Sequence, residues 1–162
     1  MITNNIQHIV ETLKQGDIVG IPTETVYGLG ANGLDEIAVQ KIFRVKGRPN
    51  KNPLILHTHS IKELKKLVKH IPKIAKKIAD HYWPGPLTIL FDKSELVSDL
   101  ITAGSKKVAV RIPSHPLFLI LPYSTSALME LRLAKVVHHL AYPNTIIHKK
   151  KHHPYLLVSF LN

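Results

Sequence analysis

The chain has 162 residues, and its 22 Lys and Arg outnumber its 11 Asp and Glu, so the net charge of +11 indicates either anionic partners or a basic surface that favours solubility. This length predicts one domain with a sizeable core, and no apolar run approaches the ~20 residues of a membrane-spanning helix. The absence of cysteine excludes disulfides and thiolate metal sites, and with no signal-peptide pattern at the start we expect a cytoplasmic protein.

The first third of the chain predicts helices that alternate with short strands. Apolar residues at helical spacing predict a helix over 4–15, which Gly16 ends, and 17–22 then predicts a buried strand leading into a glycine-bearing loop. A second helix is expected to start at Asp35 and to end at Gly47. Its predicted apolar face comprises Ile37, Ala38, Ile42 and Val45.

The middle of the chain continues the alternation, with a strand over 53–57. Ser60 and Glu63 form a capping box ahead of a lysine-rich helix, which is expected to bury Ile61, Leu64, Leu67 and Val68 and to expose its lysines. Pro72 should interrupt that helix. The remaining expected elements are a helix over 73–82 and strands over 87–91 and 106–112. Alternating strands and helices predict an α/β fold with function at the strand ends.

The last fifth of the chain has a different composition. From Leu128 onward, 35 residues hold five His, five Lys or Arg, and one acid, Glu130. The paired histidines lack the spacing of metal ligands, which favours a solvated or disordered segment over a metal site. We therefore expect two parts, residues 1–127 as a domain and 128–162 as a divergent basic tail.

Two clusters of polar residues have both structural and functional interpretations. Thr23-Glu24-Thr25 and the following glycines could hold an anion or small ligand, or form an ordinary tight turn. Lys46-Gly47-Arg48-Pro49 could be a basic helix end that complements the helix dipole, or a phosphate clamp with Arg as the forked donor.

Two single residues at strand ends raise the same question. His57 ends the apolar run "NPLILH", where a histidine is more often structural than a ligand-binding residue. Arg111 ends "VAVR", a strand predicted to be buried, and a buried arginine needs a carboxylate or phosphate partner.

Five segments, in order, resemble the YrdC-like family of L-threonylcarbamoyl-AMP synthases. They are "PTETVYGLGANG", "IFRVKGRPNKNPLILH", "WPGPLTIL", "VAVRIPSHP" and "STSA", and they span roughly residues 1–127. The resemblance implies a twisted mixed α/β sheet with flanking helices around a large, basic, concave cleft. It also implies an enzyme that condenses L-threonine, bicarbonate and ATP into threonylcarbamoyl-adenylate and pyrophosphate, for threonylcarbamoyladenosine modification at position 37 of tRNA.

The resemblance assigns roles to individual residues of this chain. Thr25, His57 and Arg111 are expected to bind threonine, with Arg111 on its carboxylate. The expected ATP-binding residues are Lys46, Arg48, Asn52 and Ser126, of which Lys46 and Arg48 are also the expected catalytic residues. Mg²⁺ is expected to accompany ATP without a metal site of the protein itself, and tRNA or tRNA-modification proteins are the expected partners.

The family pattern stops at "STSA", where the family continues with Ser-Ala-Asn and later Ser-Gly and Ser-Pro-Thr. Leu128-Met129-Glu130 follow instead. A reading-frame disruption near residue 127 would explain this, because a Leu codon ending in A before ATG contains the Asn codon AAT. We therefore expect weak or no synthase activity. The alternative is a non-catalytic RNA- or tRNA-binding module that uses the basic cleft and surface, and the oligomeric state stays open.

Overall fold

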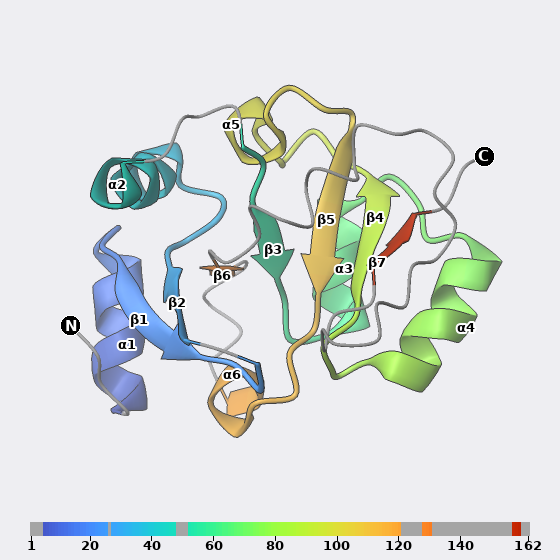
Figure 1. The fold of residues 1–162 in the computed structure, drawn as a ribbon, viewed down its shortest axis with the longest axis horizontal. Coiled ribbons are helices and arrows are strands. Elements are labelled where there is room, and N and C mark those ends of the chain that lie inside the picture. The colour runs from blue at the N-terminus through green and yellow to red at the C-terminus, as the bar shows by residue number, and fades with distance from the viewer. Residues whose placement is uncertain (1–4, 26, 48–51, 121–127, 131–156, 160–162) are drawn as a thin grey trace.

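The computed structural model describes residues 5–25, 27–47, 52–120, 128–130 and 157–159, which form helices and strands in alternation (Figure 1). The elements are α1 (Ile6–Lys14), β1 (Val19–Pro22), β2 (Tyr27–Gly30), α2 (Glu36–Lys46), β3 (Ile55–His57), α3 (Ile61–Leu67), α4 (Lys73–Tyr82), β4 (Thr88–Asp92), α5 (Asp99–Thr102), β5 (Lys107–Arg111), α6 (Pro116–Ile120), β6 (Leu128–Glu130) and β7 (Leu157–Ser159). The predicted α/β class is confirmed.

Helix boundaries follow the capping residues of the sequence. At the start of α2, the Asp35 side chain accepts hydrogen bonds from two backbone amides, and at its end Gly47 adopts a left-handed conformation with φ +56°. Ser60 Oγ accepts from the Glu63 amide at 3.3 Å, and α4 begins directly after Pro72. Asp35, Gly47 and Ser60 act as the sequence predicts, whereas Pro72 does not interrupt the lysine-rich helix, because α3 already ends at Leu67.

The glycine-bearing segment differs from its prediction, which was a loop. Residues 27–30 form strand β2, which pairs antiparallel with β1 so that Gly28 lies opposite Ile21 and Gly30 opposite Val19. The backbone groups of these residues therefore belong to a β-ladder with β1. The turn that joins the two strands carries Glu24 and Thr25.

Five strands form a second, mixed sheet in the order β6-β3-β5-β4-β7. β3 and β5 are parallel, whereas β4 is antiparallel to β5. The outer strands β6 and β7 pair with β3 and β4, respectively. Because β3 and β5 are parallel, their last residues, His57 and Arg111, lie side by side where the two strands end.

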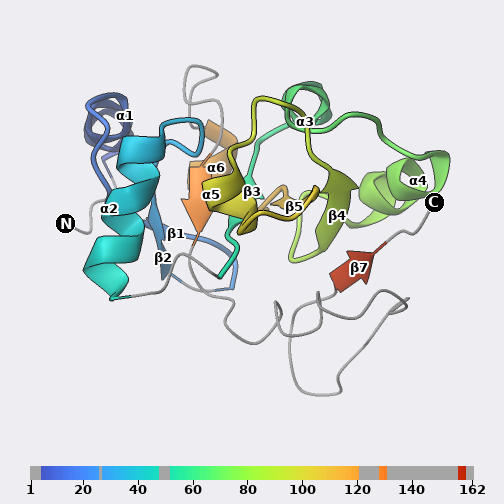
Figure 2. The ribbon, with the colours of Figure 1, turned by 90° about the horizontal axis from the view of Figure 1, so that it is seen from above.

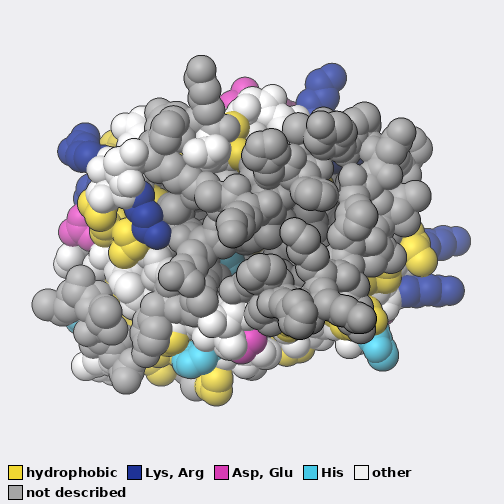
Figure 3. All heavy atoms as spheres, in the orientation of Figure 1, with side chains coloured by type: hydrophobic (Ala, Val, Ile, Leu, Met, Phe, Trp, Pro, Cys, Tyr) yellow, Lys and Arg dark blue, Asp and Glu magenta, His cyan; other side chains and the backbone are white. Residues whose placement is uncertain are grey.

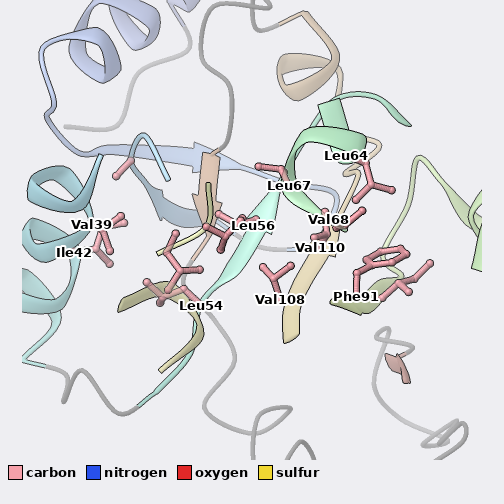
Figure 4. Packing of buried hydrophobic residues seen from close by; sticks show 14 of the residues in the cluster. Val39, Ile42, Leu54, Leu56, Leu64, Leu67, Val68, Phe91, Val108 and Val110 are labelled. Atoms are coloured by element: carbon pink, nitrogen blue, oxygen red, sulfur yellow. The ribbon is translucent and has the colours of Figure 1, made fainter. Parts of the chain in front are cut away.

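One face of this sheet packs against helices and forms the main core. Alternate residues of β3, β5 and β4 point to this face, among them Leu56, Val110 and Phe91, and they meet Leu64 and Leu67 of α3 (Figure 4). Figure 2 shows α3 and α4 on the same side of the sheet. The exposed lysines of α3 and α4 point away from the core, as the sequence predicts.

The other alternate residues point to the opposite face of the sheet. Ile55, Leu90 and Ala109 form a small apolar cluster there. Two residues further along β3 and β5, on this same face, are His57 and Arg111. The sheet therefore separates the main core from its polar residues.

The predicted apolar face of α2 is half correct. Ala38 and Ile42 are buried, but the side chains of Ile37 and Val45 are 71% and 63% exposed. The helix is amphipathic, but its buried residues are Ala38, Val39, Ile42 and Phe43. The buried face therefore does not include Ile37 and Val45, which lie near the two ends of the helix. In the described part of the chain, no helix is long and apolar enough to cross a membrane.

Candidate active site

Three polar residues form a row across the three middle strands of the five-stranded sheet, at the end of the sheet where β3 and β5 finish. In the strand register, Arg111 of β5 lies between His57 of β3 and Thr88 of β4. All three are buried, and Arg111 is only 2% exposed. Polar side chains at such depth need hydrogen-bonding or charged partners, and a buried guanidinium needs them most.

The Arg111 guanidinium binds groups from two distant segments. Its Nε donates to the Gly85 carbonyl at 3.1 Å, and its Nη2 lies 2.5 Å from Glu24 Oε1 and 3.4 Å from Thr25 Oγ1. The carboxylate partner expected for Arg111 is therefore Glu24 of this same chain. The sequence reasoning assigned no role to Glu24, since 87 residues separate it from Arg111 and no local pattern joins them.

Glu24 also contacts the segment that follows β5. Its second oxygen, Oε2, accepts a hydrogen bond from the Ser114 amide at 3.2 Å. One carboxylate therefore connects the turn between β1 and β2 to Arg111 and to the chain beyond it. This contact fixes the small sheet against the end of the large one.

The two threonines beside Glu24 hold each other in place. Their hydroxyl oxygens are 2.9 Å apart, and the Thr25 amide donates to Thr23 Oγ1 at 3.3 Å. Thr23 is buried, so it anchors this turn in the interior of the protein. The result is that the Thr25 hydroxyl faces the Arg111 guanidinium.

The carbonyl that holds Arg111 Nε requires glycine at position 85. A β-carbon there would lie 2.5 Å from the Tyr82 carbonyl oxygen, much closer than contacting atoms approach. The Gly85 amide donates to the Ile112 carbonyl at 2.7 Å, which ties the residue to the end of β5. The quoted segment "WPGP" thus supplies a backbone acceptor, a role that its sequence alone does not reveal.

His57 connects the polar row to α6. Its imidazole ring centre lies 5.5 Å from that of Phe118, with the ring planes inclined by 46°. Phe118 belongs to a second apolar cluster that α1 and β1 share with α6. The threonine-binding residues predicted from the sequence, Thr25, His57 and Arg111, are therefore brought to one place.

The residues predicted to bind ATP are only partly described. Lys46 ends α2 and is exposed, and Asn52 is half-buried in the segment leading into β3. Arg48 and Ser126 lie outside the described residues. The phosphate-binding set therefore stays a prediction, together with the basic cleft.

The arrangement around Arg111 is suited to an additional anion. Its hydrogen bonds to described residues use Nε and Nη2, and none of the described residues accepts from Nη1. A guanidinium can bind a carboxylate through two parallel N–H groups. Such a parallel pair would need Nη2 or Nε, so Nη1 by itself can donate to one oxygen of an additional anion.

A comparison with protein families identifies the family of this chain. The model of the Sua5, YciO and YrdC family, described as "Telomere recombination", matches residues 11–131, a range that includes both sheets up to β6 and the surroundings of Arg111. The chain belongs to the Sua5/YciO/YrdC family. The resemblance in the sequence motifs is thereby confirmed.

Relatives in this family carry one recurrent name. The threonylcarbamoyl-AMP synthase of Pyrococcus abyssi is 53% identical over 107 residues, and that of Bacillus subtilis is 46% identical over 110 residues. These alignments cover 66% and 67% of this chain but 32% of each relative. The chain therefore matches about a third of the length of these two relatives.

Solved structures of the Sua5/YciO/YrdC family have the same fold. A crystal structure of Pyrococcus abyssi Sua5 complexed with L-threonine has a TM-score of 0.74 and 47% identity, covering 78% of this chain and 37% of that one. Escherichia coli YciO has a TM-score of 0.69 over 95% of this chain and 76% of its own, at 19% identity, which supports the fold alone.

Proposed function

We propose that the chain acts as a threonylcarbamoyl-AMP synthase, condensing L-threonine, bicarbonate and ATP. The observation that carries the proposal is the buried Arg111, held by Glu24 and Gly85 with the hydroxyl of Thr25 beside it. Relatives support this proposal in two ways: two of them are named threonylcarbamoyl-AMP synthase, and the similar Sua5 of Pyrococcus abyssi has a structure complexed with L-threonine.

In this proposal the amino acid binds at the carboxyl ends of the central strands β3 and β5. Arg111 pairs with the threonine carboxylate through its Nη1 edge, because Nε and Nη2 already bind protein groups. Thr25 and His57 bind the rest of the threonine molecule. Holding the carboxylate at a buried arginine leaves the amino group to be oriented toward the second reactant.

The proposed chemistry gathers several anions and needs no protein nucleophile. The threonine nitrogen attacks the bicarbonate carbon, water leaves, and a carbamate forms. A carbamate oxygen then attacks the α-phosphorus of ATP, and pyrophosphate leaves. The role of the protein is to position these groups and to neutralise their charge, for which cations and oriented donors suffice.

The nucleotide part of the proposal rests on sequence resemblance. Lys46, Arg48 and Asn52 are proposed to bind the phosphates, and Ser126 the nucleotide. Mg²⁺ would arrive with ATP, because this ion usually binds through substrate phosphates. This proposal assigns no protein ligand to the ion.

The C-terminal tail bears on the rate of the proposed reaction. We propose that residues 1–127 form the family domain and that 128–162 is a divergent tail from a disrupted reading frame, which weakens turnover. The nucleotide sequence tests this proposal. A continuation encoding "SAN", "SG" and "SPT" in another frame supports it, and the absence of that continuation contradicts it.

Threonine binding tests the proposed function directly. We expect the chain to bind L-threonine in isothermal titration and to release pyrophosphate slowly, dependent on threonine and bicarbonate. Arg111→Ala should lower threonine affinity about 100-fold, because a charge-assisted pair at a buried site is lost. Arg44→Ala, which removes an exposed arginine from α2, is the matched control and should leave threonine affinity unchanged.

Two results would decide against these proposals. Failure to bind threonine, with tRNA binding that falls steeply with salt and no ATP affinity, would favour the RNA-binding alternative. On the face drawn in Figure 3, described Lys and Arg side chains project at separate points. Turnover at the rate of a full-length synthase would contradict only the predicted effect of the tail.

A further inference from the structure

We propose that Glu24 is a positioning residue for the amino-acid site: its carboxylate orients the Arg111 guanidinium so that the Nη1 edge faces the substrate. This inference rests on the proposed function, since it concerns how the threonine site is prepared. Glu24 itself need not touch the substrate. It acts through Arg111.

Arg111 carries its charge deep inside the protein. Arg111 is 2% exposed, and an isolated charge so deep is costly unless it is paired. The Glu24 side chain, itself only 21% exposed, gives Arg111 its one ion pair with a described residue. Glu24 therefore lets the arginine stay charged and ordered before any substrate carboxylate arrives.

Two acceptors fix the direction of the Arg111 guanidinium. The Gly85 carbonyl accepts from Nε, and the Glu24 carboxylate accepts from Nη2. Two fixed acceptors define the plane and rotation of this planar group. Neither of these contacts uses Nη1, so among the described residues that nitrogen keeps its N–H groups for a further acceptor.

Glu24 is itself held in place by two contacts. Its Oε1 accepts from Arg111, the last residue of β5, and its Oε2 accepts from the amide of Ser114, which follows β5. Both carboxylate oxygens therefore have a hydrogen-bond donor. A carboxylate that only filled the place of the substrate would need to swing away when the substrate bound. The Ser114 contact instead favours a carboxylate that stays in place.

Substitutions at Glu24 test whether it positions Arg111 or occupies the place of the substrate, because the two roles predict different changes in threonine affinity. Glu24→Ala removes the acceptor and should weaken threonine binding about 100-fold, whereas Glu24→Gln retains one acceptor oxygen and should restore part of that loss, to about 10-fold weaker than the unaltered chain. KM for threonine should rise with little change in kcat, and ATP affinity should not change. Glu11→Gln, on the exposed side of α1, is the matched control.

A double-mutant cycle tests the pairing without any substrate. Glu24→Ala should lower Tm because it leaves a buried cation unpaired, and Arg111→Met should lower it as well. The double variant should be more stable than the sum of the two single losses predicts, because the two residues contact each other. Additive losses would overturn the inference.

The outcomes distinguish the inference from the proposed function. If the unaltered chain does not bind threonine, the proposed function fails, and the positioning role fails with it even if the cycle shows coupling. If the unaltered chain binds threonine and Glu24→Ala binds it equally well, only the positioning role is overturned. Tighter binding by Glu24→Ala would mean that Glu24 competes with the substrate, which also overturns it.

Discussion

Arg111 occupies the least favourable position for a charge in the described fold, the centre of a sheet face at the end of a buried strand. Its partners are one carbonyl, one carboxylate and one hydroxyl, and they come from Gly85, Glu24 and Thr25. None of these three lies near it in sequence. The site is therefore produced by tertiary contacts between segments that are each unremarkable alone.

Gly85→Ala tests the backbone part of this site. The added β-carbon must displace the Tyr82 carbonyl or the Gly85 carbonyl that accepts from Arg111 Nε. We expect the free energy of unfolding to fall by about 2 kcal/mol, as for overpacking elsewhere, together with weaker threonine binding. Urea denaturation and isothermal titration measure the two effects.

Gly104→Ala is the control for the Gly85 substitution. Gly104 has φ +81° but no atom within 4 Å of an added β-carbon, so the cost is backbone strain of about 1 kcal/mol. Threonine affinity should not change. An equal loss of affinity in both variants would show that general destabilisation, and not the Gly85 carbonyl, is responsible.

At the scale of single elements, α2 is specified by its two ends. Asp35 Oδ1 accepts from the amides of Ile37 and Ala38 at 2.9 and 3.2 Å, and Gly47 closes the helix. These signals are local, because a cap acts on amides within the next turn. The same locality made the start and end of this helix predictable from sequence.

Asp35→Ala should destabilise the protein by about 1 kcal/mol, because two amides at the start of α2 lose their acceptor. Thermal or chemical denaturation followed by circular dichroism measures this loss. Asp35→Asn keeps a side-chain oxygen in the same place and should cost much less. Equal losses in the two variants would show that the negative charge, rather than the cap hydrogen bonds, is responsible.

At the scale of the whole molecule, the large sheet is stabilised by the face that meets α3 and α4. Leu56 lies at the centre of that face and is completely buried. Leu56→Ala should lower the free energy of unfolding by about 3 kcal/mol, since a cavity remains after the side chain is removed. Chemical denaturation would measure it, and a loss below 1 kcal/mol would contradict the assigned core.

Ile37→Ala is the control substitution for the stability loss expected of Leu56→Ala. The sequence placed Ile37 on the buried face of α2, but its side chain is largely exposed. An exposed residue without specific contacts contributes little, so the expected change is within about 0.5 kcal/mol. A large loss would mean that Ile37 is covered in solution.

The glycine-bearing strand β2 shows why local reasoning failed there. Gly28 and Gly30 are typical turn residues, and strand propensity alone disfavours them. Pairing with β1 overrides this preference, since it provides the hydrogen bonds that a lone segment lacks. Exposure of Ile37 and Val45 has the same origin, because which side of α2 is covered depends on where its neighbours lie.

The sequence by itself determined the α/β class, the helix caps, most strand positions and, through its motifs, the family. Those features depend on neighbouring residues or on residue order, which the sequence states directly. It also indicated that Arg111 needs an anionic partner. Only the tertiary structure decided that this partner is Glu24, that Gly85 supplies the second acceptor, and that His57 lies beside them, because a hydrogen bond across 87 residues depends on how the sheets pack.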